Sequence, residues 1–207
     1  MPYFYTVIRE HLLLGLLWVL FCVFHSVLAD INLKSWIATK APNVYRFYRL
    51  LYTLFALGTF LYIVSFQIDL RSPFLLSGTF MWIGYPVAGA GLVIMAICIK
   101  KYFISLSGLK SLATFQPNTH DLKVEGVHRY VRHPLYLGTF IFIWGLFLII
   151  PQASLLISNV IIHVYTLIGI RFEEQKLLTT FGKQYEDYRL SVPKIIPALR
   201  VKRQPSA

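Results

Sequence analysis

Five long apolar segments are the feature of this sequence that most limits how the chain can fold. They cover residues 11–29, 50–66, 79–99, 135–150 and 153–170. A helix needs about 20 residues to cross a bilayer, and these segments approach or reach that length. Only Pro151-Gln152 separates the last two, which predicts a tight hairpin. We therefore expect an all-α, polytopic membrane protein with about five transmembrane helices.

Charged residues are scarce and are sorted along the chain. They make up 14% of the residues, whereas a soluble domain averages nearer a quarter. Of the 20 lysines and arginines, only Arg9 and Arg71 lie outside the segments 30–49, 100–134 and 171–207. Because positive charge accumulates on the cytoplasmic side, this pattern predicts an external N-terminus and a cytoplasmic C-terminus. Four or six spans would scatter the basic residues over both sides, so the charges also favour five.

The net charge of +11 indicates a bilayer surface, not a nucleic acid, as the partner of the basic loops. Anionic lipid headgroups attract such loops, which lie directly against them. Cys22 and Cys98 lie inside apolar segments, and no cysteine spacing suggests a metal site. The first segment lacks a basic n-region and a convincing cleavage site, so we expect it to be retained as a helix.

The run Arg132-His133-Pro134 precedes the fourth apolar segment. Proline is tolerated in the first turn of a helix, so this helix is expected to start at or near Pro134. Arg132, His133 and the free backbone amides of the helix N-terminus would favour an anionic group. Gly138, one turn further on, would let a ligand approach the backbone.

Glu173 and Glu174 lie near the end of the fifth segment, where the helix dipole does not favour carboxylates. Unless they are simply solvated, two adjacent acids in this position call for a cation. Together with Arg132 and His133, they would offer one binding group for a carboxylate and another for an ammonium or sulfonium. This combination predicts a site for a zwitterionic, partly aromatic cofactor at the cytoplasmic face.

Other polar residues lie within the apolar segments, where ionisable groups usually face a cavity or a partner. Helical spacing puts Asn159, His163 and Glu174 on one stripe, and Tyr136, Phe140 and Trp144 on one face of the preceding helix. These two faces would bound a tunnel to the site, although an interhelical hydrogen bond explains His163 equally well. His25, in the first segment, is either a proton acceptor or a packed, hydrogen-bonded histidine.

These residues resemble the isoprenylcysteine carboxyl methyltransferase-type superfamily of integral membrane methyltransferases. The resemblance covers 122–197, just over a third of the chain. Its pieces are Gly126, the run from Tyr130 to Gly138, Glu173-Glu174, Phe181-Gly182-Lys183-Gln184-Tyr185, Tyr188, Val192-Pro193 and Pro197. The resemblance implies that S-adenosylmethionine binds to Arg132, His133, Tyr136, Gly138, Glu173 and Glu174. Family members often have an aromatic residue where this chain has His128, which puts a stacking role there in doubt.

Further pieces are similar to the branch that contains methanethiol S-methyltransferases and the nuclear-envelope protein nurim. They are His25-Ser26-Val27-Leu28-Ala29, Lys34, Ser107-Gly108-Leu109-Lys110 and the run from Ile168 to Glu174. This resemblance shifts the expected methyl acceptor from an isoprenylcysteine-type carboxylate towards a small or lipophilic thiol. A neutral thiol or amine would need a proton acceptor, for which His25 and His163 are the candidate catalytic residues.

No repeat or long linker divides the chain, so we expect a single membrane domain over 1–207. It would comprise three N-terminal helices in 1–99, a cofactor-binding methyltransferase core in 100–197 and a disordered basic tail in 198–207. The core would end in a cytoplasmic helix, stopped by Gly182, and an aromatic, proline-rich strip. Two alternatives are a non-catalytic membrane scaffold and an NADPH-dependent membrane reductase, although a reductase needs further basic contacts for phosphate groups.

Overall fold

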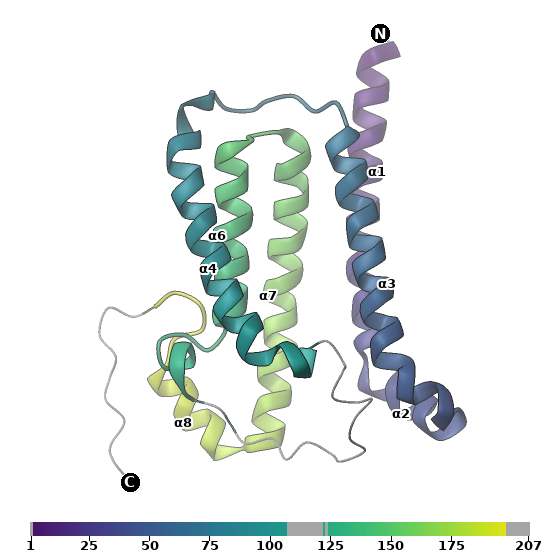
Figure 1. Cartoon of the computed structure of the whole chain (residues 1–207), viewed down its shortest axis with the longest axis vertical. Coiled ribbons are helices and arrows are strands. Elements are labelled where there is room, and N and C mark those ends of the chain that lie inside the picture. Colours follow the sequence, from purple (N-terminus) through teal and green to yellow (C-terminus); the bar gives the residue numbers. More distant parts are fainter. Residues whose placement is uncertain (1, 107–121, 123, 198–207) are drawn as a thin grey trace. The chain divides into compact units, whose positions relative to one another are not determined.

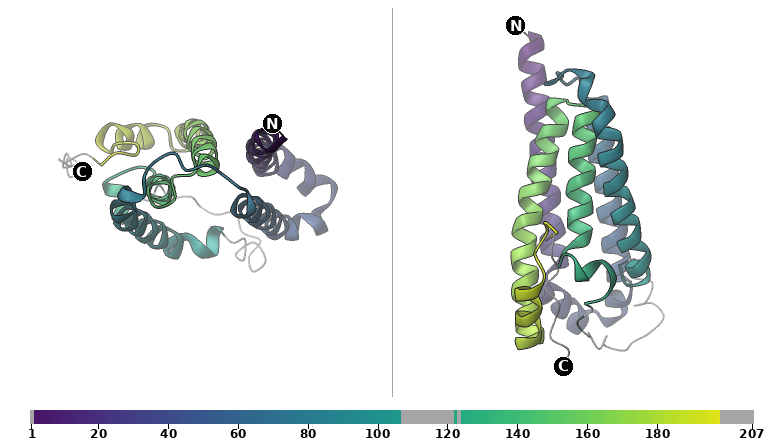
Figure 2. Two further views of the ribbon diagram at one scale, coloured as in Figure 1. Left: turned by 90° about the horizontal axis from the view of Figure 1, so that it is seen from above. Right: turned by 90° about the vertical axis from the view of Figure 1, so that its left-hand side faces the viewer.

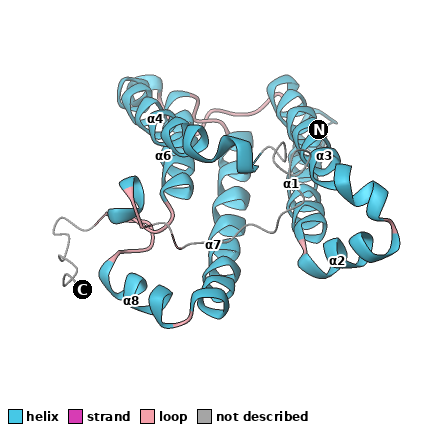
Figure 3. Ribbon diagram, turned by 60° about the horizontal axis from the view of Figure 1, so that its bottom comes forward, coloured by secondary structure: helices cyan, strands magenta, loops and turns pink. Residues whose placement is uncertain are grey.

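The computed structural model describes residues 2–106, 122 and 124–197, and within them every regular element is a helix (Figures 1 and 3). The predicted roles of residues 107–121 and of the tail 198–207 lie outside the described residues. The α-helices are α1 (Pro2–Ala29), α2 (Ile31–Lys40), α3 (Pro42–Asp69), α4 (Met81–Leu106), α6 (Pro134–Ile149), α7 (Ala153–Phe181) and α8 (Lys183–Ser191). Two short 3₁₀ helices, η1 (Gly78–Phe80) and η2 (Gly126–Arg129), precede α4 and α6.

Among the described residues, four helices are long and apolar enough to span a bilayer. The candidate spans are Tyr5–Ala29, Leu50–Asp69, Met81–Lys100 and Ala153–Phe181. The fifth predicted segment is the shorter apolar helix α6, which has 16 residues. The prediction of an all-α, polytopic membrane protein is therefore confirmed, with four full-length candidate spans and one shorter helix.

The described helices fall into two compact units. The first unit contains α1, α2, α3 and the part of α7 that ends at Ile162. The second contains α4 as far as Lys101, then η2, α6, the rest of α7 and α8. The organisation as a single membrane domain stays a prediction.

In the first unit, α1 and α3 run side by side (Figures 1 and 2). Leu14, Trp18 and Ile63 are almost fully buried between them, and Ile161 of α7 packs against this cluster. The short helix α2 joins α1 to α3. At its start, the Asp30 carboxylate accepts hydrogen bonds from the backbone amides of Asn32 and Leu33. These amides would otherwise lack partners.

In the second unit, α4 and α6 approach each other through small residues. A Cβ atom added to Gly91 would lie 2.8 Å from the Gly138 carbonyl oxygen, and one added to Gly145 would lie 2.7 Å from the Ala88 Cα. Small residues let membrane helices pack closely in this way. Gly91 and Gly145 are therefore sites of close packing, whereas Gly89 has no atom within 4 Å of its missing side chain.

The helices α6 and α7 form the predicted hairpin, because only residues 150–152 separate them. In the second unit their contacts follow an antiparallel order. Trp144 and Phe140 contact His163, while Tyr136 contacts Glu173. The face predicted for these three aromatic residues of α6 is thus the one turned towards α7.

The segment after α7 folds differently from the predicted strip. Gly182, with a φ of 52°, ends α7 as predicted, because glycine adopts this backbone conformation without strain. Residues 183–191 then form α8, so Tyr185 and Tyr188 belong to a helix. Both side chains are buried against α7, where they pack on Leu177 and neighbouring residues. They are core residues of the second unit.

Candidate functional site

The backbone of the segment before α6 is held by the segment after α8. The Arg132 amide donates a hydrogen bond of 2.9 Å to the Pro193 carbonyl, and the His133 amide donates one of 3.1 Å to the Lys194 carbonyl. The helix α6 begins at Pro134, as the sequence predicted. These bonds fix Arg132 and His133 beside the first turn of α6, and they bring Lys194 to the same place.

Glu174 of α7 is the shared acceptor of the site. Its Oε1 accepts hydrogen bonds from Arg132 Nε at 2.9 Å and Nη2 at 2.7 Å, and it lies 3.2 Å from His133 Nε2. Its Oε2 lies 3.3 Å from Lys194 Nζ. The side chains of Arg132 and Glu174 are only 7% and 9% exposed, so this ion pair is largely shielded from solvent.

The Arg132 guanidinium also donates to backbone carbonyls at the end of α8 and directly after it. Its Nη1 donates to the carbonyls of Arg189, at 2.9 Å, and Val192, at 2.5 Å. One side chain therefore joins the start of α6, the end of α7 and the end of α8. This planar donor set is the reason a lysine would not replace Arg132.

Glu173 occupies the outer part of the same cluster. Its carboxylate accepts a hydrogen bond of 3.1 Å from the Tyr136 hydroxyl and lies 3.7 Å from His133 Nδ1. The rings of His133 and Tyr136 stack with their centroids 5.7 Å apart. In contrast to Glu174, the Glu173 side chain is 45% exposed, so its carboxylate remains open to a ligand.

Tyr185, which the sequence analysis did not assign to the site, belongs to its wall. Burial and the Glu174 carboxylate raise the pKa of its hydroxyl, and Arg132 opposes the rise, so that the pKa is about 12. Lys194 was not predicted either. No periodicity of the sequence indicates its contact with Glu174, which depends on pairing between segments about sixty positions apart.

Tyr188 and His128 link α8 to the segment that precedes α6. The Tyr188 hydroxyl donates a hydrogen bond of 2.7 Å to the His128 carbonyl. His128 Nδ1 lies 3.1 Å from the Arg132 carbonyl oxygen. These contacts give His128 a place in the framework that holds Arg132.

The remaining predicted residues lie elsewhere. At Gly138 the missing side chain points to α4, since an added Cβ would lie 3.0 Å from Ile94 and Met95; its cofactor role stays a prediction beside this packing role. His163 stacks on Phe140 at 4.0 Å and accepts a hydrogen bond of 3.4 Å from Trp144. These contacts fill the space between α6 and α7 at this level, where a tunnel was predicted. They favour the interhelical hydrogen bond over a substrate role.

His25 lies in the first unit, whereas the cluster around Glu174 lies in the second. Its ring nitrogens are 2.8 and 3.0 Å from the Tyr52 hydroxyl. This hydrogen bond matches the packed histidine that the sequence allowed, and the catalytic role of His25 stays a prediction.

Comparison with known proteins assigns the chain to a family. The family model described as phospholipid methyltransferase matches residues 81–184, a range that contains α4, α6, α7 and both glutamates. The chain belongs to this family. The relatives reported below are methyltransferases whose names give different methyl acceptors. The family name therefore does not specify the acceptor of this chain.

The chain is similar to several curated methyltransferases. It is 28% identical to the methanethiol S-methyltransferase of Pseudomonas deceptionensis, over 89% of this chain and 72% of the relative. It is 30% identical to the methanethiol S-methyltransferase of Crocosphaera subtropica, over 88% and 72%. A shorter match, 30% identical over 50% of this chain and 47% of the relative, joins it to the protein-S-isoprenylcysteine O-methyltransferase of Schizosaccharomyces pombe. No solved structure matches the chain significantly.

These relatives extend over most of the chain, and they are methyltransferases, not reductases or scaffolds. Together with the apolar helices, they show that the protein is an integral membrane methyltransferase.

Proposed function

We propose that the protein transfers the methyl group of S-adenosylmethionine to a small or lipophilic thiol, and that methanethiol is the simplest such acceptor. The similarity to two methanethiol S-methyltransferases over nearly nine tenths of the chain supports this acceptor class. The cluster at the start of α6 and the end of α7 supports the cofactor. The single observation that carries the proposal is the half-exposed Glu173 carboxylate beside the buried Arg132–Glu174 pair.

The groups of the cluster fit the charged end of this cofactor. Glu173 presents a carboxylate that is exposed and held by one described hydrogen bond, from Tyr136, so it can accept an ammonium group. Lys194 is 41% exposed and offers a cation for a carboxylate. The Tyr136 ring, which stacks on the buried ring of His133 and bonds to Glu173, offers an aromatic surface to a sulfonium or a purine.

Arg132 and Glu174 have a different role in this proposal. Because both are buried and bonded to each other, they position the residues that bind the cofactor. Arg132 holds the backbone after α8, and Glu174 holds Lys194 and His133. The groups that bind the cofactor are then in place before it arrives, so that less of the binding free energy is lost in ordering them.

The cofactor supplies an electrophilic methyl group on a sulfonium, so the protein has to align the two reactants and exclude water. A thiolate needs no further activation for an in-line displacement. A neutral thiol must lose its proton. His163 and His25 stay candidate acceptors of that proton, although the described nitrogens of both rings are engaged by Trp144 and Tyr52.

The distribution of basic residues supports a cytoplasmic site. Arg132, Arg171, Lys176, Lys183, Arg189 and Lys194 lie around the cluster in the sequence, and positive charge marks the cytoplasmic side of a membrane protein. We propose that the N-terminus lies outside, with the site and the C-terminus in the cytoplasm.

Calorimetric titration with S-adenosylmethionine tests the proposal. We expect the purified protein to bind it, and Glu173→Gln to weaken binding by about 10- to 100-fold, because a hydrogen bond to a charged group contributes about 1.5–3 kcal/mol. Glu186→Gln, which changes an exposed acid on α8, is the matched control and should bind normally. Unchanged affinity in Glu173→Gln would refute the role of this carboxylate. Binding without methylation of methanethiol would refute the acceptor only.

A further inference from the structure

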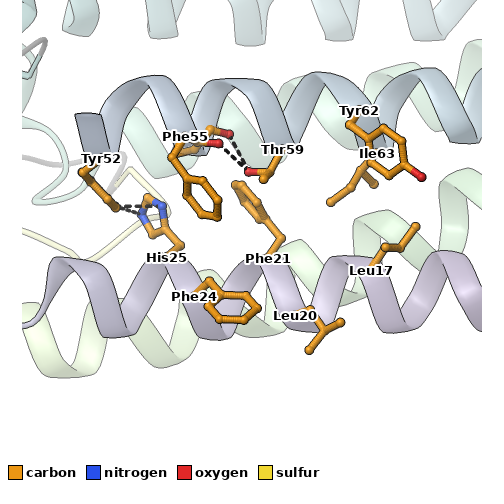
Figure 4. A pocket seen from close by; sticks show the side chains of 11 residues that line it. Leu17, Leu20, Phe21, Phe24, His25, Tyr52, Phe55, Thr59, Tyr62 and Ile63 are labelled. Carbon is orange, nitrogen blue, oxygen red and sulfur yellow. Dashed lines mark hydrogen bonds between the residues drawn. The ribbon is translucent and has the colours of Figure 1, made fainter. Parts of the chain in front are cut away.

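A groove between α1 and α3 is a second feature of the chain that its methyltransferase function does not explain. It has a volume of about 280 Å³ and lies wholly within the first unit (Figure 4). Its walls are almost entirely apolar and are formed by Leu17, Leu20, Phe21, Phe24, His25, Tyr52, Phe55, Ala56, Thr59, Tyr62 and Ile63. The Thr59 hydroxyl donates to the Phe55 and Ala56 carbonyls of its own helix, so it adds no unsatisfied polar group to the wall.

The groove is open to the surroundings of the helices along its side. Phe24, Phe55 and Tyr62 are 52%, 48% and 63% exposed, and all three lie inside candidate membrane spans. An exposed apolar surface at this depth faces lipid chains. The ligand that enters it from the side is therefore one that is dissolved in the bilayer.

The length of the groove corresponds to one leaflet. Its α3 wall runs from Tyr52 to Ile63, which at about 1.5 Å per residue is about 16 Å. The hydrocarbon core of a bilayer is about 30 Å thick, so the groove covers about half of it. It is also small, because its volume of about 280 Å³ lies just below the range of about 300–1,000 Å³ that drug-sized ligands occupy. Both dimensions suit a single extended acyl chain better than a ring system or a partner helix.

One end of the groove is polar and basic. There the Tyr52 hydroxyl bonds to His25, and the helix α2, which carries Lys34, begins directly after the end of α1. The connecting segment 30–49 carries four basic residues and one acid, Asp30. Because four bases stand against one acid, this segment has a net positive charge.

We propose that this groove binds one acyl chain of an anionic phospholipid, whose phosphate lies at the end formed by His25, Tyr52 and Lys34. The chain lies against the apolar wall, and the headgroup lies where the basic segment meets the membrane surface, which attracts anionic lipids. This assignment is independent of the proposed methyl transfer, because it uses residues of the first unit alone.

Native mass spectrometry of the full chain, released from detergent, tests the assignment. The probes are phosphatidylglycerol and phosphatidylcholine with identical acyl chains, added in equal amounts. We expect the protein to retain phosphatidylglycerol about fivefold better, the preference that one basic side chain near the surface gives. Equal retention of the two lipids would overturn the proposal, as would a dimer that carries no lipid.

Two neighbouring positions of α3 give a matched pair of variants. Ala56→Trp fills the groove, whereas Leu57→Trp adds the same side chain at an exposed position that does not line it. We expect Ala56→Trp to lose most of the bound phosphatidylglycerol and Leu57→Trp to keep it. Equal retention by both variants would place the lipid elsewhere.

The variant Lys34→Gln keeps the proposal testable should Ala56→Trp fail to fold. It leaves the apolar wall unchanged and removes a charge at the polar end. We expect it to bind both lipids with similar affinity, through loss of the preference for phosphatidylglycerol. An unchanged preference would contradict the position assigned to the phosphate.

Discussion

The substitution Glu174→Gln tests whether the buried ion pair holds the second unit together. The glutamine keeps the size of the side chain but removes the charge that pairs with Arg132, His133 and Lys194. Arg132 would then keep its full charge in a place where its side chain is 7% exposed. Breaking a buried pair by removing one partner costs about 3–5 kcal/mol, since the other charge is left uncompensated.

The structure indicates the lower end of this range. Arg132 retains two backbone acceptors, the carbonyls of Arg189 and Val192, and the glutamine oxygen still accepts a hydrogen bond. Lys194 is 41% exposed, so water can solvate it. We therefore expect a loss of about 3 kcal/mol, which for a chain of this size lowers the Tm by about 6–12 °C.

Thermal unfolding in detergent, followed by circular dichroism, measures this change. Glu173→Gln serves as the comparison, because its carboxylate is 45% exposed and its loss should lower the Tm by only about 1–4 °C, in line with a hydrogen bond of about 0.5–1 kcal/mol. The two adjacent acids should thus separate into one that stabilises the fold and one that binds the cofactor. Equal Tm values for the wild type and Glu174→Gln would refute the reasoning from the buried pair.

Two further predictions follow from the packing of the second unit. Gly91→Leu should prevent the close approach of α4 and α6 and lower the folded yield, because a side chain at Gly91 meets neighbouring backbone. Gly89→Ala should be tolerated, because no atom lies within 4 Å of that position. Equal yields of the two variants in size-exclusion chromatography would contradict this reasoning. Tyr185, whose pKa of about 12 exceeds the ordinary value of 10, stabilises the fold fully below pH 10, and this contribution is lost as the pH rises from 10 to 12. Tyr185→Phe should therefore reduce the fall in stability over that interval, and an identical pH profile of the free energy of unfolding would count against the shift.

Much of the site was accessible from the sequence because its residues lie at helix ends. Proline fixes the start of α6, so the position of Arg132 and His133 followed from local rules. The pair Glu173-Glu174 lay near the end of an apolar helix, and the short connection at 150–152 implied that the two ends meet. The structure brings these four residues into one cluster.

The partners within the cluster were not accessible in the same way. The sequence suggested two separate binding groups, a cationic one and an anionic one, each of which would contact the ligand directly. In the structure Arg132 and Glu174 bind each other, and of the two acids only Glu173 is substantially exposed. Which of two adjacent acids is buried depends on the rotation of α7 against α6, and the spacing of residues fixes that rotation only to within a fraction of a turn.

Long-range backbone pairing explains the other differences. Lys194 reaches Glu174 because residues 193 and 194 accept hydrogen bonds from residues 132 and 133, a contact that no local pattern indicates. The prolines after α8 suggested an extended strip, yet Tyr185 and Tyr188 are spaced three apart, which is the spacing of one buried helical face. Gly138 has a packing role against α4 that the sequence did not indicate, and its role in binding the cofactor stays a prediction.

Photo-crosslinking of radiolabelled S-adenosylmethionine to the purified protein tests the location of the donor site most directly. After digestion with trypsin, which cleaves after lysine and arginine, we expect the label in the peptides 133–171 and 172–176, which carry Tyr136 and Glu173. Unlabelled cofactor should compete for this labelling, and Glu173→Gln should reduce it. Label confined to peptides of α1 or α3, or no label that competes, would contradict the assignment of the cofactor to this cluster.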